Sequence, residues 1–257
     1  MEKNFRILVS NDDGIYSEGI NALKEAMSEL GEVLVYAPHK QQSAVGHAIT
    51  THLPLRVNPY YLNGELFGYA VTGTPADCVK LAVTTLLDKK PDLIVSGINH
   101  GSNTAINVIY SGTVSAATEG TILGIPSIAF SLTSYTDFDF TYSKKVAKII
   151  ASQVLKNGLP KGVLLNVNIP PVPEDQIKGI KVTKQGKSKW NDYFERRLDP
   201  SNREYFWLTG SMNINNDDPD SDVMAIQNNY VSVTPIQFDL TDYTFLEELK
   251  NWKFDEV

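Results

Sequence analysis

The sequence contains one cysteine, Cys78, among 257 residues. A single thiol cannot form a disulfide within the chain, which excludes a disulfide-stapled secreted scaffold. Long apolar runs are also missing. No stretch approaches the roughly 18 apolar residues of a membrane-spanning helix, and the short run after Arg6 is too brief for the core of a signal peptide. We therefore expect a cytoplasmic protein without a membrane anchor.

Basic charge is scarce as well. The chain has 23 Lys and Arg against 30 Asp and Glu, which gives a formal net charge of −7. Proteins that bind the nucleic-acid backbone present a basic face, so we expect no nucleic-acid polymer as a partner. A small anionic substrate is compatible with this charge if a cation or backbone amides offset the repulsion.

Short apolar runs alternate with helical patterns along the first half of the chain. The runs at 7–10, 32–37 and 92–96 suit buried strands, and the spacing of Ile20, Leu23 and Met27 suits a helix between the first two. Strand, helix and strand joined by short loops form a βαβ unit. With 42% hydrophobic residues, the pattern predicts an α/β fold with a mainly parallel sheet and a sizeable core.

Two adjacent carboxylates follow the first expected strand. Asp12 and Asp13 lie in the segment Ser10-Asn-Asp-Asp-Gly14, and the carboxyl end of a strand is where open α/β sheets bind ligands. Two aspartates there suit a hard cation such as Mg²⁺ or Mn²⁺, which prefers oxygen ligands. The alternative interpretation is a plain turn, since Asn, Asp and Gly are all common turn residues.

Further oxygen donors follow the second and third expected strands. Ser43 lies in the loop after residues 32–37, and Asn99 lies in the loop after residues 92–96. Because parallel strands end at the same edge of a sheet, these side chains are expected to approach the aspartate pair. One cation could then bind to donors that are far apart in the sequence.

A helix of small residues is expected from Val114 onward, after the segment Tyr110-Ser-Gly-Thr113. Free amides at a helix start, with the hydroxyls of Ser111 and Thr113, suit a phosphate group. An ordinary Ser or Thr helix cap is the alternative explanation for the same residues.

The remaining patterns predict peripheral structure. An Asn63-Gly64 turn signal indicates an antiparallel hairpin within residues 48–72. Residues 180–210 alternate β-prone and charged positions, as exposed hairpins do. The acidic segment 217–222 is expected to be a solvated turn, because its Gly and Glu placement does not fit an EF-hand. An amphipathic helix is expected from Thr241.

Five motifs occur in order between Ile7 and Pro235. They are Ser10-Asn-Asp-Asp-Gly14, Gly73-Thr-Pro-Ala-Asp-Cys-Val79, Ser96-Gly-Ile-Asn-His-Gly101, Tyr110-Ser-Gly-Thr-Val114 with Glu119-Gly120, and Tyr230-Val-Ser-Val-Thr-Pro235. Together they resemble the SurE family, the survival-protein-E 5′/3′-nucleotidases. The resemblance implies an α/β, Rossmann-like core of three layers that binds metal and phosphate, in residues 1–135. Residues 136–257 are then expected to complete the sheet and to carry hairpins for oligomerisation as a homodimer or homotetramer.

The resemblance also implies a reaction. It indicates a divalent-metal-dependent phosphomonoesterase that converts nucleoside 5′-monophosphates, with 3′-monophosphates as further candidates, to nucleoside and phosphate. The implied cofactor is one Mg²⁺ or Mn²⁺ per subunit, held by Asp12, Asp13, Ser43 and Asn99. We expect Asp12 to assist an in-line attack by water and Asp13 mainly to anchor the cation. A phospho-aspartyl intermediate on Asp12 is the alternative.

Other residues are expected to bind the phosphoryl group and to support catalysis. The expected residues that bind the substrate or orient its phosphoryl group are Asn99, His100, Asn103, Ser111, Gly112 and Thr113. Asn99, Ser111 and Thr113 join Asp12 as the expected catalytic set. His100 has two alternative roles: it protonates the leaving oxygen, or it lies at the rim of the site.

Some positions depart from the common family pattern. The second loop reads Gln42-Ser43-Ala44 where many members have Arg-Ser-Gly, so one positive charge toward phosphate is lost. Ala105 and Asn107 replace a glycine and an acidic residue that are often found there. Two alternative functions stay open: a non-catalytic nucleotide-binding regulatory module, or a phosphatase for sugar phosphates or short polyphosphate.

Overall fold

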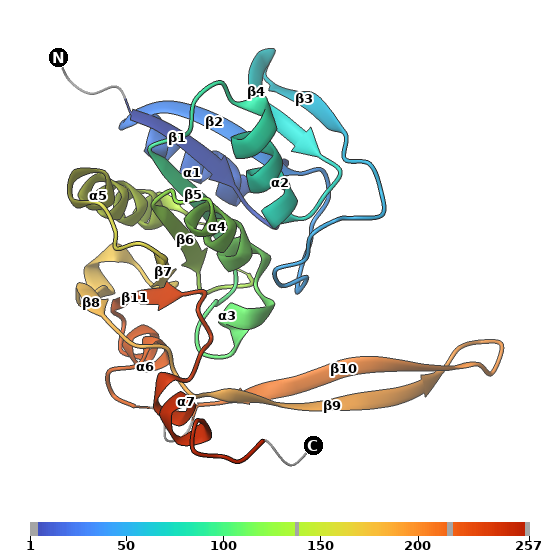
Figure 1. The fold of residues 1–257 in the computed structure, drawn as a ribbon. Coiled ribbons are helices and arrows are strands. Elements are labelled where there is room, and N and C mark those ends of the chain that lie inside the picture. The colour runs from blue at the N-terminus through green and yellow to red at the C-terminus, as the bar shows by residue number, and fades with distance from the viewer. Residues whose placement is uncertain (1–4, 137–138, 215–217, 255–257) are drawn as a thin grey trace.

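The computed structural model describes residues 5–136, 139–214 and 218–254. Within these ranges, one nine-stranded sheet forms the centre of the molecule (Figure 1). Its strands are β1 (Phe5–Ser10), β2 (Gly31–Pro38), β3 (Val57–Leu62), β4 (Glu65–Val71), β5 (Leu93–His100), β6 (Ser127–Leu132), β7 (Val163–Ile169), β8 (Ile180–Val182) and β11 (Val231–Gln237). In space they follow the order β3-β4-β2-β1-β5-β6-β7-β11-β8.

The strands from β4 to β7 in this order are all parallel, whereas β3 and β11 are antiparallel to their inner neighbours. Counted by their position along the chain, the parallel strands follow the order 3-2-1-4-5-6 of a Rossmann fold. The order reverses between β1 and β5, which lie side by side. The predicted Rossmann-like fold with a mainly parallel sheet is thus confirmed.

Helices cover both faces of the sheet. Figure 1 shows α1 (Glu18–Ser28) and α5 (Thr141–Asn157) on one face, and α2 (Pro75–Leu81) and α4 (Gly112–Ile122) on the other. Helices are the usual connection between parallel strands, because each crossover must return the chain to the start of the next strand. The predicted three-layer architecture is therefore confirmed.

Side-chain caps define the starts of α1 and α2. Ser17 caps α1 by accepting a hydrogen bond from the Ile20 amide, and Thr74 and Asp77 form a reciprocal capping box at the start of α2. Pro75 occupies the first turn of α2, where the missing amide of proline leaves no helical hydrogen bond unmade. The chain continues through a π-helical turn, Ala82–Leu86. These caps satisfy amide groups that helix ends otherwise leave without partners.

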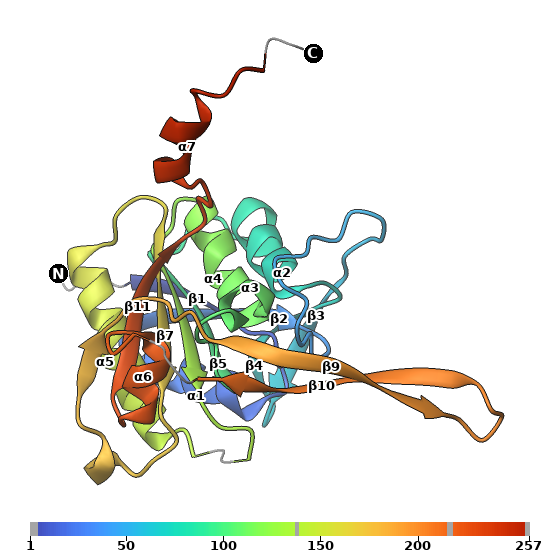
Figure 2. The same ribbon diagram turned by 90° about the horizontal axis from the view of Figure 1, so that it is seen from below.

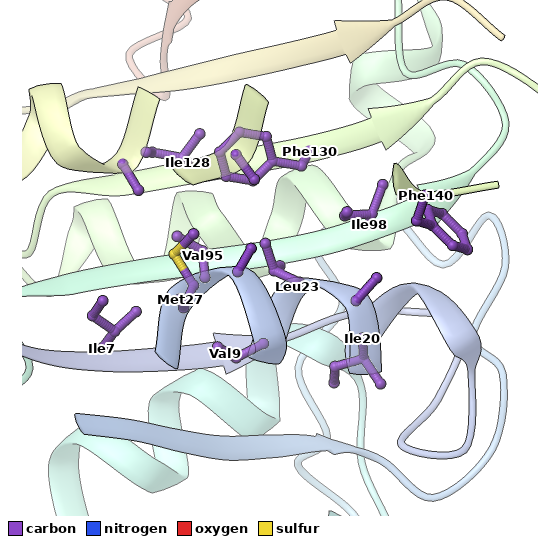
Figure 3. Close-up of a cluster of buried hydrophobic side chains, with 14 of the residues drawn as sticks. Ile7, Val9, Ile20, Leu23, Met27, Val95, Ile98, Ile128, Phe130 and Phe140 are labelled. Atoms are coloured by element: carbon purple, nitrogen blue, oxygen red, sulfur yellow. The ribbon is translucent and has the colours of Figure 1, made fainter. Parts of the chain in front are cut away.

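The larger hydrophobic core lies between the sheet and α1 with α5. Figure 3 shows Ile20, Leu23 and Met27 of α1 against apolar side chains of β1, β5 and β6. Ile20, Leu23 and Met27 are completely buried, and burial of such a side chain contributes about 1.5–3 kcal/mol. A second cluster on the α2 and α4 face includes Cys78, whose thiol is buried. The two clusters hold β1 and β5 rigidly between them.

The C-terminal half completes the sheet and adds a projecting arm. Strands β9 (Lys189–Leu198) and β10 (Glu204–Asn213) form a separate antiparallel hairpin that extends well beyond the body in both views (Figures 1 and 2). The predicted exposed hairpin is thus present. Its role in oligomerisation, and the division of the chain at residue 135, stay predictions.

Short helices complete the chain: α3 (Asn107–Tyr110), a 3-10 turn (Glu174–Gln176), α6 (Asp222–Gln227) and α7 (Tyr243–Leu249). Helix α7 confirms the expected helix in the tail. The hairpin of β3 and β4 confirms the antiparallel excursion, with Asn63 and Gly64 at positive φ in its turn. Within the described ranges, none of the helices combines the length and apolar character needed to cross a membrane.

Candidate active site at the switch point of the sheet

The loop after β1 holds the two expected aspartates beside β5. Ser10 at the end of β1 is level with Ser96 of β5, so the chain leaves β1 at the point where the strand order reverses. Asn11 fixes the loop by donating from Nδ2 to the Gly14 carbonyl at 2.9 Å and to the Ser17 hydroxyl at 2.8 Å. Ligands bind at such switch points in open α/β sheets.

Strand β5 is longer than predicted, and this corrects the assignment of Asn99 and His100 to a loop. Pairing with β6 shifts register between Ser96 and Asn99 and then resumes, with Asn99 opposite Ser131. A Gly-Ile-Asn sequence resembles a turn, but β6 provides partners that carry the strand to His100. Asn99 donates from Nδ2 to the Gly101 carbonyl at 2.9 Å, which leaves its Oδ1 as the atom available to a ligand.

Asp12 is almost fully buried, with 6% of its surface exposed. Burial raises the pKa of its carboxyl group to about 6, although the hydrogen bond from the Thr113 hydroxyl to Oδ1 acts in the opposite direction. The neighbouring Asp13 carboxylate also raises this pKa. The surroundings of Asp12 therefore disfavour the negatively charged form of its carboxyl group.

Asp13 is oriented from two sides. The backbone N–H of His100 donates to Oδ2 at 3.2 Å, and Gln41 Nε2 donates to Oδ1 at 3.3 Å. Burial raises the pKa of Asp13, and the hydrogen bond from the His100 backbone opposes this effect. The bond to His100 joins the loop after β1 directly to the end of β5, so the two acids and Asn99 share one corner of the sheet.

An open cavity of about 1360 Å³ lies over this corner. Its volume exceeds that of typical small-molecule sites, which is about 300–1,000 Å³. The described residues that line it include four carboxylates, those of Asp12, Asp13, Glu18 and Asp192, and no Lys or Arg. A cation is thus more compatible with the bare cavity than an anion is.

Most of the residues predicted for the site lie around this cavity. The predicted residues that line it are Asp12, Asp13, Ser43, Asn99, His100, Asn103 and Ser111. Ser111 also caps α4, because its hydroxyl accepts from the Val114 amide at 3.1 Å, so the capping interpretation describes its local role. The ring of His100 lies edge-on to Phe140, with ring centres 5.1 Å apart.

Gly112 and Thr113 lie behind Asp12 and do not line the cavity. Thr113 is completely buried, and its hydroxyl donates to Asp12. The expected contact between the Thr113 hydroxyl and a phosphate is therefore not available in this arrangement; the hydroxyl orients Asp12 instead. A Cβ added at Gly112 would lie 2.7 Å from Cβ of Asp12, so glycine is what allows the start of α4 to approach the acid this closely.

The donor set fits a hard divalent cation. It combines the carboxylates of Asp12 and Asp13 with the Asn99 amide oxygen and the Ser43 hydroxyl, all oxygen donors. Among the described residues, no three His, Cys, Asp or Glu side chains form a group that suits a metal, so a cation at this site would also use the amide and hydroxyl oxygens. Burial raises the pKa of both aspartates. A bound cation would lower these pKa values again, because it stabilises the charged carboxylates.

The loop that carries Ser43 is attached to three neighbouring elements. The Gln42 amide donates to the Asp12 carbonyl at 2.7 Å, and the Gly46 amide donates to the Tyr110 carbonyl at 3.0 Å. Further along, His47 Nε2 lies 2.9 Å from Glu119 Oε2 in α4. Glu119 is 2% exposed and also pairs with Lys80 of α2. The sequence analysis missed this network. The available signal was a single acidic residue, Glu119, in a helix of small residues that packs closely on the sheet.

We expect Glu119→Gln to change the pH dependence of stability. Burial alone would raise the pKa of Glu119, but the hydrogen bonds from His47 and Lys80 outweigh it and the pKa is lowered. Such a group stabilises the fold above its unfolded pKa, near 4.5, and this contribution is lost as the pH falls through the folded pKa. Thermal unfolding from pH 7 to 4 should therefore show a smaller acid-induced drop in melting temperature for Glu119→Gln than for wild type.

Glu29→Gln is the matched control, because Glu29 is 60% exposed in its pair with Lys148 and surface pairs contribute little. Its melting temperature should follow that of wild type at every pH. Identical pH profiles for Glu119→Gln and wild type would show that the buried network does not stabilise the fold.

Two buried asparagines support the far wall of the site. Asn166 and Asn168 of β7 donate from Nδ2 to the Asn103 carbonyl at 2.7 and 3.2 Å, and Asn103 Nδ2 donates to the Ser131 hydroxyl at 2.8 Å. Sequence analysis did not single out this pair. The signal was two polar residues at alternate positions in an otherwise apolar strand, Val163-Leu-Leu-Asn-Val-Asn-Ile169.

The acidic segment near α6 also supports this wall, which corrects the prediction of a solvated turn for Asp222. Asp222 is completely buried and accepts hydrogen bonds from the amides of Ala105 at 3.0 Å and Gly186 at 2.9 Å. It therefore connects the loop after β5 to the segment that leads into β9. Asp217 lies outside the described residues.

Comparison with known proteins identifies the family. The model of the family described as Survival protein SurE matches residues 7–192. The chain is 51% identical over 247 residues to the 5′-nucleotidase SurE of Syntrophobacter fumaroxidans, with 96% of this chain and 99% of that protein covered. It is 50% identical to the 5′-nucleotidase SurE of Chlorobaculum tepidum, with 96% of this chain and 94% of that protein covered.

A solved structure shows the same architecture. The crystal structure of the SurE protein from Aquifex aeolicus superposes with a TM-score of 0.83 at 44% sequence identity, covering 95% of this chain and 98% of that one. The sequence matches extend over nearly the full chain, and the structural match includes the Rossmann strand order that places the two aspartates beside Asn99. On both grounds the chain belongs to the SurE family.

Proposed function

We propose that this protein is a nucleotidase that hydrolyses nucleoside 5′-monophosphates to nucleoside and phosphate, with one Mg²⁺ or Mn²⁺ per subunit. One observation carries the proposal: the buried carboxylate of Asp12 and the partly buried carboxylate of Asp13 lie with Asn99 at the switch point, under a cavity whose described lining contains no Lys or Arg. The relatives named as 5′-nucleotidase SurE support the nucleotide as substrate. The same reaction on 3′-monophosphates is part of the proposal.

The charge balance of the site explains why a cation is needed. A phosphomonoester carries about two negative charges near neutral pH, and the four carboxylates that line the cavity would repel it. His100 is the only Lys, Arg or His residue in the described lining. Asp12, Asp13, Asn99 and Ser43 are the residues that would hold the ion. When bound, it polarises a phosphoryl oxygen and lowers the pKa of water.

The chain's own groups position the reaction. Thr113 fixes the carboxylate of Asp12 through Oδ1, and in the proposal Asp12 orients the attacking water and accepts its proton. Asp13 is restrained by the His100 amide and Gln41, which suits a group that anchors a cation. Ser111 and Asn103 also line the cavity and would orient the phosphoryl oxygens. His100 would donate a proton to the leaving oxygen.

The test is phosphate release from a panel of nucleoside monophosphates, ribose 5-phosphate and short polyphosphate, with and without a chelator. We expect release from the nucleotides with Mg²⁺ or Mn²⁺, its loss with the chelator, and its recovery when excess ion is added. Nucleotide binding without release in any divalent ion would instead identify the regulatory module. Faster turnover of polyphosphate or ribose 5-phosphate than of every nucleotide would identify the alternative phosphatase.

A further inference from the structure

The base of the β9–β10 hairpin forms one wall of the active-site cavity. Asp192 and Gly210 are direct partners across the two strands, and Trp190 and Leu208 lie two residues from them. Alternate residues of a strand share a face, so these four residues lie on one face, and all four line the cavity. Figures 1 and 2 show this end of the hairpin beside α3.

Trp190 is held in place within this wall. Its indole Nε1 donates to Asn107 Oδ1 at 2.6 Å, and Asn107 donates in turn to the Ser102 carbonyl at 3.3 Å. Ser102 lies two residues after the end of β5. The indole is therefore tied to the loop beside the proposed cation site, and it stays 38% exposed toward the cavity side. A fixed and partly exposed aromatic ring is suited to stack on a planar ligand.

Asp192 presents a carboxylate beside the same wall. A Cβ at Gly210 would lie 3.0 Å from Oδ1 of Asp192. Because Gly210 has no side chain, the Asp192 carboxylate can lie over the neighbouring strand. The Asp192 carboxylate makes no hydrogen bond or ion pair with the side chain or backbone of another described residue. A carboxylate accepts hydrogen bonds and donates none. It therefore selects a ligand edge that carries N–H groups.

From these contacts we infer that the hairpin wall is the subsite for the nucleobase, with Trp190 stacking on the base and Asp192 accepting from an exocyclic amino group. The inference rests on the proposed nucleotidase function and specifies its substrate: bases with an exocyclic amino group are preferred over uracil, whose exocyclic groups are both carbonyl oxygens. The cavity of about 1360 Å³ has room for a nucleoside as well as a phosphate. Tyr135, which packs against Gly101, adds a second aromatic side chain to the lining.

The experiment compares matched substrates on the full-length protein with Mn²⁺. Cytidine and uridine 5′-monophosphates differ in the amino group that Asp192 is inferred to bind, and ribose 5-phosphate has no base. Wild type should show about tenfold higher kcat/KM for the cytidine than for the uridine nucleotide, which corresponds to about 1.4 kcal/mol. Asp192→Asn should remove this preference, because an amide both donates and accepts hydrogen bonds.

Trp190→Ala tests the stacking role. It should lower the ratio of kcat/KM for cytidine 5′-monophosphate to that for ribose 5-phosphate about tenfold, mainly through a higher KM for the nucleotide. Trp207→Ala is the matched control, because Trp207 is exposed on the opposite face of the same hairpin. The ratio of the two kcat/KM values for the Trp207→Ala protein should equal that of wild type.

Different results would refute the nucleotidase proposal and the nucleobase subsite. If wild type releases phosphate from neither nucleotides nor ribose 5-phosphate, the nucleotidase proposal and this subsite are both refuted. If wild type turns over nucleotides but Trp190→Ala lowers both substrates equally, or Asp192→Asn keeps the preference, the subsite is refuted and the nucleotidase proposal stands.

Discussion

Asp12→Asn is expected to lower phosphate release by about 10²–10³-fold, the range found when a preorganised catalytic group is removed, while the fold is kept. Asparagine retains an acceptor for the Thr113 hydroxyl and has nearly the same shape. It removes the negative charge that would bind the cation and accept a proton from water. Initial rates with saturating Mn²⁺, beside circular dichroism of both proteins, measure the two effects separately.

Asp88→Asn is the matched control for this substitution. Asp88 is an exposed carboxylate that pairs with Arg6, so its loss should leave the rate within about twofold of wild type. An Asp12→Asn protein as active as the Asp88→Asn protein would remove Asp12 from the mechanism.

The same Asp12→Asn substitution should stabilise the metal-free protein at alkaline pH. With a pKa of about 6 in the folded protein against 3.8 normally, the folded chain keeps the Asp12 proton in a pH window where the unfolded chain has released it. Stability therefore falls as the pH rises through this window, and the full penalty remains above pH 6. The difference between these pKa values corresponds to about 3 kcal/mol, an upper bound for the gain at pH 8 in chelator, measured by urea unfolding.

Gly19→Ala is expected to have the largest effect on stability. A Cβ at Gly19 would lie 2.0 Å from the Ile98 carbonyl oxygen, and this carbonyl belongs to β5 just before Asn99. Neither the helix nor the buried strand can move without disturbing the core in Figure 3. Overpacking of this kind costs about 1–3 kcal/mol, so the melting temperature should fall by about 2–12 °C, and the Mn²⁺ concentration for half-maximal activity should rise.

Asn21→Ala provides the comparison within the same helix. Among the described residues, the Asn21 side chain hydrogen-bonds only to the exposed Glu25 side chain, and alanine favours helix. Its melting temperature and Mn²⁺ dependence should match those of wild type. Equal behaviour of Gly19→Ala and Asn21→Ala would mean that the close packing of α1 on β5 is not required to shape the site.

The sequence predicted those parts of the fold whose signals are local. The apolar run of β1 ends at an Asn-Asp-Asp-Gly turn, and β2 ends at Pro38, so both strands and their shared edge could be placed. The proximity of Asp12, Asp13 and Asn99 followed from the geometry of parallel strands. Family resemblance added the Rossmann order and the reaction, neither of which the spacing of residues determines.

Features that depend on a distant partner could not be predicted. Strand β5 continues to His100 because β6 pairs with it again, and Asp222 is buried because amides from two other segments donate to it. Thr113 binds Asp12, about a hundred positions earlier in the chain, instead of facing the cavity. Trp190 and Asp192 resembled ordinary hairpin residues until the tertiary fold placed them beside the cavity.

The central claim is that separated oxygen donors bind one cation, and crystals soaked in Mn²⁺ test it most directly through an anomalous difference map. The account predicts one peak per subunit, within bonding distance of carboxylate oxygens from Asp12 and Asp13 and of Oδ1 of Asn99. A Mn²⁺-dependent enzyme whose crystals show no peak at this corner, or a peak bound elsewhere, would contradict it.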